Sequence, residues 1–76
     1  MADEISTLMN NNKAKDILLR LRNNKTLHGT LKDFDIHMNL TLQDAEDISD
    51  ETPVKLGTIL LRGDNILAVS LPKEES

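Results

Sequence analysis

The first dozen residues carry apolar side chains at the spacing of a helix. Ile5, Leu8 and Met9 recur at intervals of three and four, which places them on one helical face. The asparagines at residues 10–12 are typical of a helix end. We therefore expect a helix over about residues 3–11. A helix this short is stable only when it packs against an apolar surface.

After Asp16 the apolar period changes from that of a helix to that of a strand. Ile17, Leu19 and Leu21 fall at every second position, as in a strand with one buried face. The turn-forming pair Asn23-Asn24 follows, and strand-like runs return along the rest of the chain. The predicted strands cover residues 17–22, 27–32, 37–43, 54–61 and 65–71, within about residues 16–71. The pattern therefore predicts a mostly β fold with a short N-terminal helix.

A few positions depart from simple alternation. Phe34 falls on the wrong face to continue the second strand, so we expect a bulge or sharp bend near Asp33. Gly29 is expected where strands pack closely or bend. The third strand is predicted to begin at His37 or Met38, with the Met38 side chain facing the core.

Composition marks the remaining connectors. The segment Glu46–Pro53 is rich in acidic residues and is expected to form a solvated, mobile loop. Gly63 and Asp64 predict a hairpin-type turn before the last strand. Pro72 ends that strand, and residues 72–76 are expected to fray.

The length and composition limit how such a chain can be stabilised. Its 76 residues form one predicted domain, residues 1–76, whose core supplies only about 3–5 kcal/mol. There are no cysteines for disulfides, which also fits a cytoplasmic protein, and His28 and His37 lack the company a metal ion needs. No cofactor is expected, and no apolar run approaches the roughly 20 residues of a membrane span. Self-association is the expected source of extra stability.

Two runs near the C-terminus are apolar on both faces of their strands. They are Ile59–Leu61 and Ile66–Val69, in the predicted fourth and fifth strands. An edge strand with two apolar faces promotes aggregation unless another chain covers it. Head-to-tail pairing of one edge with a different edge gives a ring when the rotation between subunits closes.

Two short polar stretches carry the candidate chemistry. His37 and Asn39 stand two apart, so on an extended backbone their side chains point the same way. Imidazole can stack on a base, and an amide offers a hydrogen-bond donor beside an acceptor. Arg62, in the turn-like stretch Arg62–Asn65, could close over the same base. With a net charge of −4, any nucleic-acid binding depends on cations concentrated locally.

These stretches resemble the two motifs of the Sm-like (LSm) proteins, most closely the archaeal members that form single-sequence rings. The first motif runs from Leu27 to Leu40 and contains Phe34-Asp35-Ile36-His37-Met38-Asn39, and the second is Leu61-Arg62-Gly63-Asp64-Asn65-Ile66. Both motifs are in the family's order, and the likeness extends from the N-terminal helix to Leu71.

The resemblance implies a strongly bent five-stranded antiparallel sheet, a small open barrel, behind a short helix. It also implies a homo-oligomeric ring, typically a heptamer, joined through the fourth and fifth strands. Its pore would bind uridine-rich single-stranded RNA, one base per subunit, in RNA processing, turnover or chaperoning. On this sequence His37 and Arg62 would hold the base between them, and Asn39 would read the uracil edge.

The other motif residues are implied to support this site. Asp64 would hold Asn39 in orientation, and Gly63 would allow a close backbone approach. Asp35 would fix the first loop by hydrogen bonding without touching the base. The sequence departs from the family at Asp33, where a glycine is common, and this adds an acid near the site.

Other functions are compatible with parts of the sequence. A structural or protein-interaction ring without specific RNA binding is the main alternative, and a monomeric peptide-binding barrel is a third. Arg20, Arg22, Lys25 and Lys32 form either a solvated face or a secondary RNA surface. No enzyme is predicted, because the sequence shows neither a nucleophile–base arrangement nor a phosphate-binding glycine loop.

Overall fold

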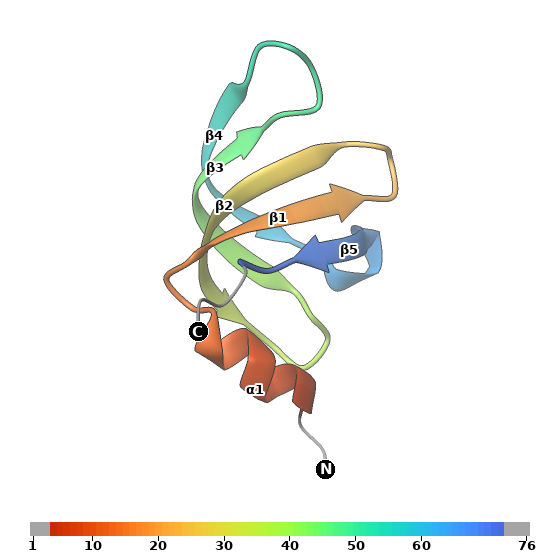
Figure 1. Ribbon diagram of the computed structural model, residues 1–76. Coiled ribbons are helices and arrows are strands. Elements are labelled where there is room, and N and C mark those ends of the chain that lie inside the picture. The colour runs from red at the N-terminus through yellow and green to blue at the C-terminus, as the bar shows by residue number, and fades with distance from the viewer. Residues whose placement is uncertain (1–3, 73–76) are drawn as a thin grey trace.

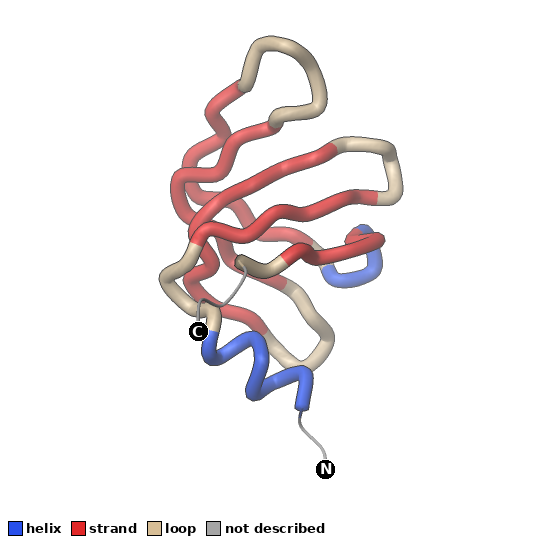
Figure 2. The backbone as a smooth tube through the Cα atoms, viewed as in Figure 1, coloured by secondary structure: helices blue, strands red, loops and turns tan. Residues whose placement is uncertain are grey.

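The computed structural model describes residues 4–72, which form a short helix followed by a bent sheet. The elements are α1 (Glu4–Asn11), β1 (Asp16–Leu21), β2 (Thr26–Phe34), β3 (Leu40–Asp47), β4 (Val54–Leu61), the 3-10 turn η1 (Gly63–Asn65) and β5 (Ile66–Ser70). Figures 1 and 2 show the strands curling around one another, with α1 packed at one end. The predicted fold class is confirmed. The predicted helix start at residue 3 and the fraying of residues 73–76 lie outside the described residues.

The order of strands leaves two edges open in a single chain. All neighbours are antiparallel, and the order is β4-β3-β2-β1-β5. β4 and β5 therefore lie at opposite ends of the hydrogen-bonded series, each with one edge that has no partner strand within residues 4–72. These are the two strands whose sequences are apolar on both faces.

The core is built from the alternating side chains that the sequence predicts. Its largest fully buried side chains come from the first three strands, and they are Ile17, Leu19, Leu31, Leu40 and Leu42. Burying one such side chain contributes about 1.5–3 kcal/mol. The helix adds only Met9, which is 3% exposed, whereas Ile5 and Leu8 are 65% and 49% exposed. The predicted apolar helical face is therefore only partly buried.

The third strand begins later than predicted. β3 starts at Leu40, so the predicted start at His37 or Met38 is wrong. Met38 has a φ of 63°, in the left-handed region, which an extended strand excludes. The cause is Asp35, whose carboxylate accepts the backbone N–H groups of His37 and Asn39 and holds the chain in a turn. The Met38 side chain still packs against the core.

β2 bends at the two places that the sequence marks. Its pairing with β3 shifts register across Gly29 and again just before Asp33. The second shift confirms the predicted bulge and leaves Phe34 packed against the core. At Gly29 an added Cβ would lie 3.1 Å from the Ala45 Cα, which confirms close packing there.

The acidic connector is shorter than predicted, because β3 continues through Glu46 and Asp47. The start of the remaining loop is tied to β2. The Ser49 hydroxyl donates to Asp47 Oδ1 at 2.6 Å and accepts the Thr26 backbone N–H at 2.8 Å. The predicted start of the acidic loop at Glu46 is therefore wrong.

His28 links three strands on the outer face of the sheet. Its Nε2 lies 2.8 Å from Glu46 Oε1 on β3, and its Nδ1 lies 3.2 Å from Asp16 Oδ1 on β1. Hydrogen bonding to Asp16 first, and then to Glu46, raises the pKa of His28 above its ordinary value of 6.5. The His28 ring therefore bridges one carboxylate on each neighbouring strand, and both carboxylates favour its protonated form.

Candidate nucleic-acid interface

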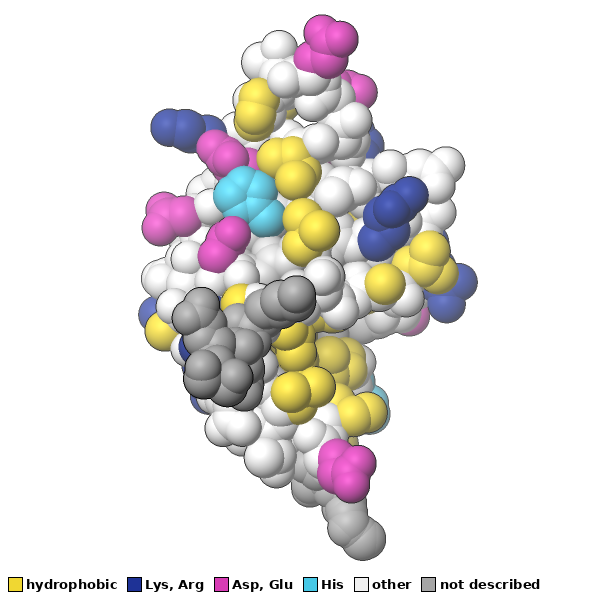
Figure 3. All heavy atoms as spheres, in the orientation of Figure 1, with side chains coloured by type: hydrophobic (Ala, Val, Ile, Leu, Met, Phe, Trp, Pro, Cys, Tyr) yellow, Lys and Arg dark blue, Asp and Glu magenta, His cyan; other side chains and the backbone are white. Residues whose placement is uncertain are grey.

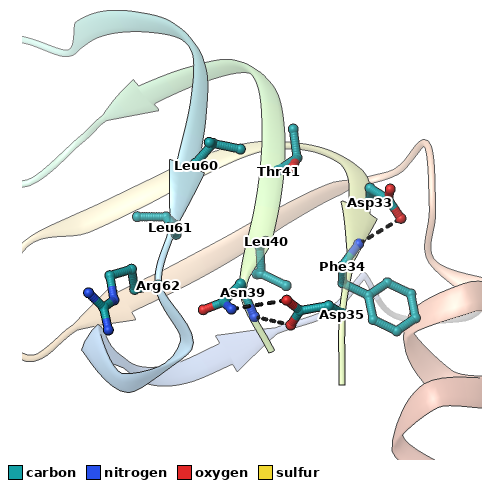
Figure 4. A pocket seen from close by; sticks show the side chains of 9 residues that line it. All are labelled: Asp33, Phe34, Asp35, Asn39, Leu40, Thr41, Leu60, Leu61 and Arg62. Carbon is teal, nitrogen blue, oxygen red and sulfur yellow. Dashed lines mark hydrogen bonds between the residues drawn. The ribbon is translucent and has the colours of Figure 1, made fainter. Parts of the chain in front are cut away.

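Asp35 organises the loop between β2 and β3. Its Oδ1 accepts the backbone N–H groups of His37 and Asn39, each at 2.9 Å. Its Oδ2 accepts a side-chain N–H of Asn39 at 3.0 Å, as Figure 4 shows. The Asp35 N–H in turn donates to the Asn39 carbonyl at 3.1 Å. One carboxylate thus fixes both the path of the loop and the orientation of the Asn39 amide.

These donors favour the ionised form of the Asp35 carboxyl group. They lower the pKa of Asp35 below its ordinary value of 3.8, and the Asn39 side chain is the largest cause, followed by the Asn39 backbone. Asp35 is therefore ionised at neutral pH and acts only as an acceptor.

Gly63 joins the second loop to the first. Its N–H donates to Asn39 Oδ1 at 2.7 Å, although the two residues are 24 apart in sequence. A Cβ at position 63 would overlap the His37 carbonyl oxygen and lie 3.0 Å from the Met38 carbonyl carbon. Only glycine allows the two loops to approach this closely.

The Asn39 amide is held at both ends. Its nitrogen must face the Asp35 carboxylate, which only accepts, and its oxygen must face the Gly63 N–H, which only donates. Each end can still make one more hydrogen bond, the nitrogen through its second N–H and the oxygen through its second lone pair. This pair matches a ring edge with an acceptor beside an N–H, such as O4 and N3–H of uracil. Cytosine presents the reverse pattern at the same two positions.

Arg62 lies at the start of the second loop, directly before Gly63. Its Nη2 is 3.6 Å from Asp64 Oδ2, and the two side chains are 79% and 71% exposed. An exposed ion pair of this kind contributes about 0–1 kcal/mol, so the guanidinium can move to stack on a planar ring. Because Gly63 touches the His37 carbonyl, the backbones that carry His37 and Arg62 lie side by side.

A shallow pocket of about 390 Å³ opens beside these groups, between the ends of β2, β3 and β4. Figure 4 shows Asn39 and Arg62 on one side of it and Phe34 on the other. Leu60 adds a second apolar wall. The polar atoms of the site thus lie at the border of an apolar surface, an arrangement common in ligand sites.

The nearby acidic groups are largely compensated. Asp33, the departure from the family pattern, lies 3.5 Å from Lys13 Nζ. The same ammonium group lies 5.6 Å from the centre of the Phe34 ring. With Asp35 hydrogen-bonded and Asp64 beside Arg62, the site repels an anionic chain less than its count of acids indicates.

Two further features are absent from residues 4–72. No three histidine or carboxylate side chains there are grouped so as to hold a metal ion. No helix in that part of the chain is long and apolar enough to cross a membrane.

Comparison with known families identifies this pair of loops. Residues 7–71 match the sequence profile of the LSM domain, a span that includes both loops of the site. The chain belongs to the LSM domain family.

Relatives of this LSM domain include archaeal snRNP Sm-like proteins. The protein of Pyrococcus horikoshii is 41% identical over 76 residues, which cover 99% of this chain and 100% of the relative. The protein of Methanosarcina barkeri is 38% identical over 71 residues, which cover 92% of this chain and 99% of the relative.

Solved structures of other LSM proteins share the fold. The heptamer of P. aerophilum SmAP1 is 34% identical, with a TM-score of 0.89 over 97% of this chain and 100% of that one. The Pyrococcus abyssii Sm protein, solved in complex with a uridine heptamer, is 37% identical, with a TM-score of 0.83 over 92% of this chain and 100% of that one.

One supporting role expected for this LSM domain differs from the observed geometry. Asp64 was predicted to hold Asn39 in orientation, but the Asn39 amide bonds to Asp35 and to the Gly63 N–H. Within the described residues the Asp64 carboxylate faces Arg62 instead. The amide is therefore oriented by the neighbouring turn and by a backbone donor.

Sequence reasoning also missed one contact to the second loop of the LSM domain. The Arg22 side chain, predicted to belong to a solvated face or a secondary RNA surface, donates from Nε to the Asp64 carbonyl at 2.8 Å. These residues are 42 apart in sequence, and no periodicity signals such a contact.

Proposed function

We propose that this LSM domain forms a homo-oligomeric ring, a heptamer, that binds uridine-rich single-stranded RNA in its central pore. Its role would be in RNA processing, turnover or chaperoning in the cytoplasm, by binding and not by catalysis. His37 and Arg62 hold each base between them, and Asn39 reads its edge. Gly63 keeps the loops in register, while Asp64 restrains Arg62 when no base is bound.

The single observation that carries this proposal is the fixed Asn39 amide. Both of its ends are already tied to the protein, so the amide cannot rotate to suit a different base. A hydrogen-bonding site that presents one fixed donor and one fixed acceptor disfavours a base that leaves them unpaired. This explains a preference for uracil without a basic surface.

The open edges support the ring. Leu60 on β4 and Leu67 on β5 are 79% and 61% exposed in the single chain, at the two edges that lack partner strands. Pairing β4 of one subunit with β5 of the next covers both residues and closes head to tail. Solved neighbours include a heptameric archaeal Sm protein, 37% identical to this chain with a TM-score of 0.83 over 88% of this chain and 98% of that one.

The test compares oligo-U with oligo-A in fluorescence anisotropy titrations. We expect the wild type to prefer oligo-U, because base stacking adds about 1–3 kcal/mol per base and the amide selects among stacked bases. His37→Ala and Arg62→Ala should abolish the preference while native mass spectrometry still shows the ring. His28→Ala is the matched control, since that histidine lies on the outer face and should leave the preference unchanged.

A structural ring without specific RNA binding predicts a different outcome. In that case the wild type shows no measurable preference between the two oligonucleotides. Asp35→Ala would then disrupt the oligomer, because the loops would serve only assembly. A preference retained in either His37→Ala or Arg62→Ala would refute the stacking roles.

A further inference from the structure

Arg22 connects the end of β1 to the loop that carries Arg62. Its backbone N–H donates to the Asn65 carbonyl at 3.0 Å. Its side chain donates from Nε to the Asp64 carbonyl at 2.8 Å. The Arg22 guanidinium is therefore held against η1 from the side of β1, while Arg62 approaches the Asp64 carboxylate of the same turn.

The charge of Arg22 is not compensated as the charge of Arg62 is. Among the ion pairs of residues 4–72, Arg62 lies 3.6 Å from Asp64, but no carboxylate lies within 4.0 Å of Arg22. The Nε–H is occupied, whereas the two terminal nitrogens carry N–H donors with no partner in that part of the chain. Such a planar pair of donors fits the oxygens of a phosphate group.

We infer that Arg22 is a further RNA-binding residue, which contacts a phosphate of the nucleotide whose base lies between His37 and Arg62. This inference rests on the proposed function, because it takes that base to be bound beside Arg62. The phosphates are joined to the clamped nucleoside and must pass close to the turn that carries Arg62. Arg22 is anchored to that turn, so its free donors face the path of the RNA backbone.

The electrostatics of the chain make such a contact valuable. A subunit with a net charge of −4 lacks a general attraction for RNA, so affinity must come from cations placed near the backbone. Figure 3 shows Lys and Arg side chains at the side of the molecule where Figure 1 places the β1–β2 hairpin and η1. Several acidic side chains lie at the opposite side of the same view, where some Lys and Arg side chains lie as well.

Arg22 could instead serve only to position η1, and two substitutions separate the roles. Arg22→Gln places an amide nitrogen at the position of Nε, so it keeps a donor for the Asp64 carbonyl but removes the charge. Arg22→Lys keeps the charge but has a methylene where Nε was, so it loses that donor. One variant therefore tests the charge and the other tests the anchor.

The experiment measures oligo-U and oligo-A affinities of the full chain as a function of salt concentration. We expect Arg22→Gln to lower the affinities for oligo-U and oligo-A by the same factor. We also expect its log–log salt slope to fall in magnitude by about 0.7 for each phosphate that the variant no longer binds. Arg22→Lys should retain the wild-type salt slope.

The outcomes distinguish this inference from the proposed function. A wild-type salt slope in Arg22→Gln, with oligo-U still preferred, would overturn the phosphate contact and leave the proposed function intact. Loss of the oligo-U preference in Arg22→Lys, with Arg22→Gln unaffected, would assign Arg22 a positioning role only. Failure of the wild type to bind oligo-U would overturn both proposals.

Discussion

Replacing Gly63 with alanine tests the contact that joins the two loops. The added methyl group would overlap the His37 carbonyl oxygen and lie 3.0 Å from the Met38 carbonyl carbon. Both obstacles are backbone atoms, held by the hydrogen bonds of the Asp35 turn, so they cannot rotate away as a side-chain tip can. The loops must therefore separate.

The loss of folding stability in Gly63→Ala is the sum of two contributions. Overpacking of this kind costs about 1–3 kcal/mol. Separation of the loops also removes the 2.7 Å bond from the Gly63 N–H to Asn39 Oδ1, which adds about 0.5–1.5 kcal/mol. Loss of this hydrogen bond also releases one end of the Asn39 amide. We therefore expect the selectivity for uracil to fall together with the free energy of unfolding.

The assay is oligo-U binding by Gly63→Ala, with the ring mass checked by native mass spectrometry. We expect the affinity to fall by about tenfold or more, the equivalent of about 1.4 kcal/mol, and the preference over oligo-C to shrink. Gly57→Ala is the control, since it is strained by a φ of 76° but an added Cβ there has no atom within 4 Å. It should lose about 1 kcal/mol of stability and keep its selectivity. Wild-type affinity and selectivity in Gly63→Ala would refute the reasoning.

Three further changes follow from the same contacts. Asp35→Asn should reduce oligo-U binding severalfold, because its amide would set a donor against the Asn39 N–H. In the wild type the pKa of Asp35 is lowered in the folded protein. Its contribution to stability is therefore complete above pH 3.8 and should be lost as the pH falls from 3.8 through the lowered pKa. For His28 the raised pKa gives the opposite sign: its stabilisation, about 1 kcal/mol or less, is complete below pH 6.5 and is lost as the pH rises through the raised value. Melting temperatures measured at several pH values and a fixed subunit concentration check the direction of both effects. In His28→Gln the fall in melting temperature above pH 6.5 should disappear. Leu60→Asp should lower the native mass by placing a charge on the β4 edge, whereas Leu18→Asp, on a strand with partners on both sides, should not.

Alternation of side chains was enough to predict the sheet, because one buried face imposes a period of two. Leu19 and Leu42 fall where that period places them, and both are 0% exposed. The bulge near Asp33 was also predictable, since Phe34 could reach the core only if the period slipped. Patterns of this kind involve residues close together in the chain, so they can be recognised from the sequence alone.

The parts that were missed depend on individual hydrogen bonds, some within one turn and one between distant segments. The left-handed Met38 follows from the capture of two backbone N–H groups by Asp35, which competes with a strand at that point. The Asn39–Gly63 bond depends on how loops 24 residues apart meet, and no period encodes that. The residues of the site were therefore named from motif resemblance, while their mutual hydrogen bonds required the fold.

The most direct measurement is native mass spectrometry of the wild type mixed with equal amounts of heptauridine and heptacytidine. The account predicts a closed ring of seven subunits that retains one heptauridine and excludes heptacytidine. Separate single chains, or a ring that retains both oligonucleotides equally, would contradict the claim that a fixed Asn39 amide reads uracil in a shared pore.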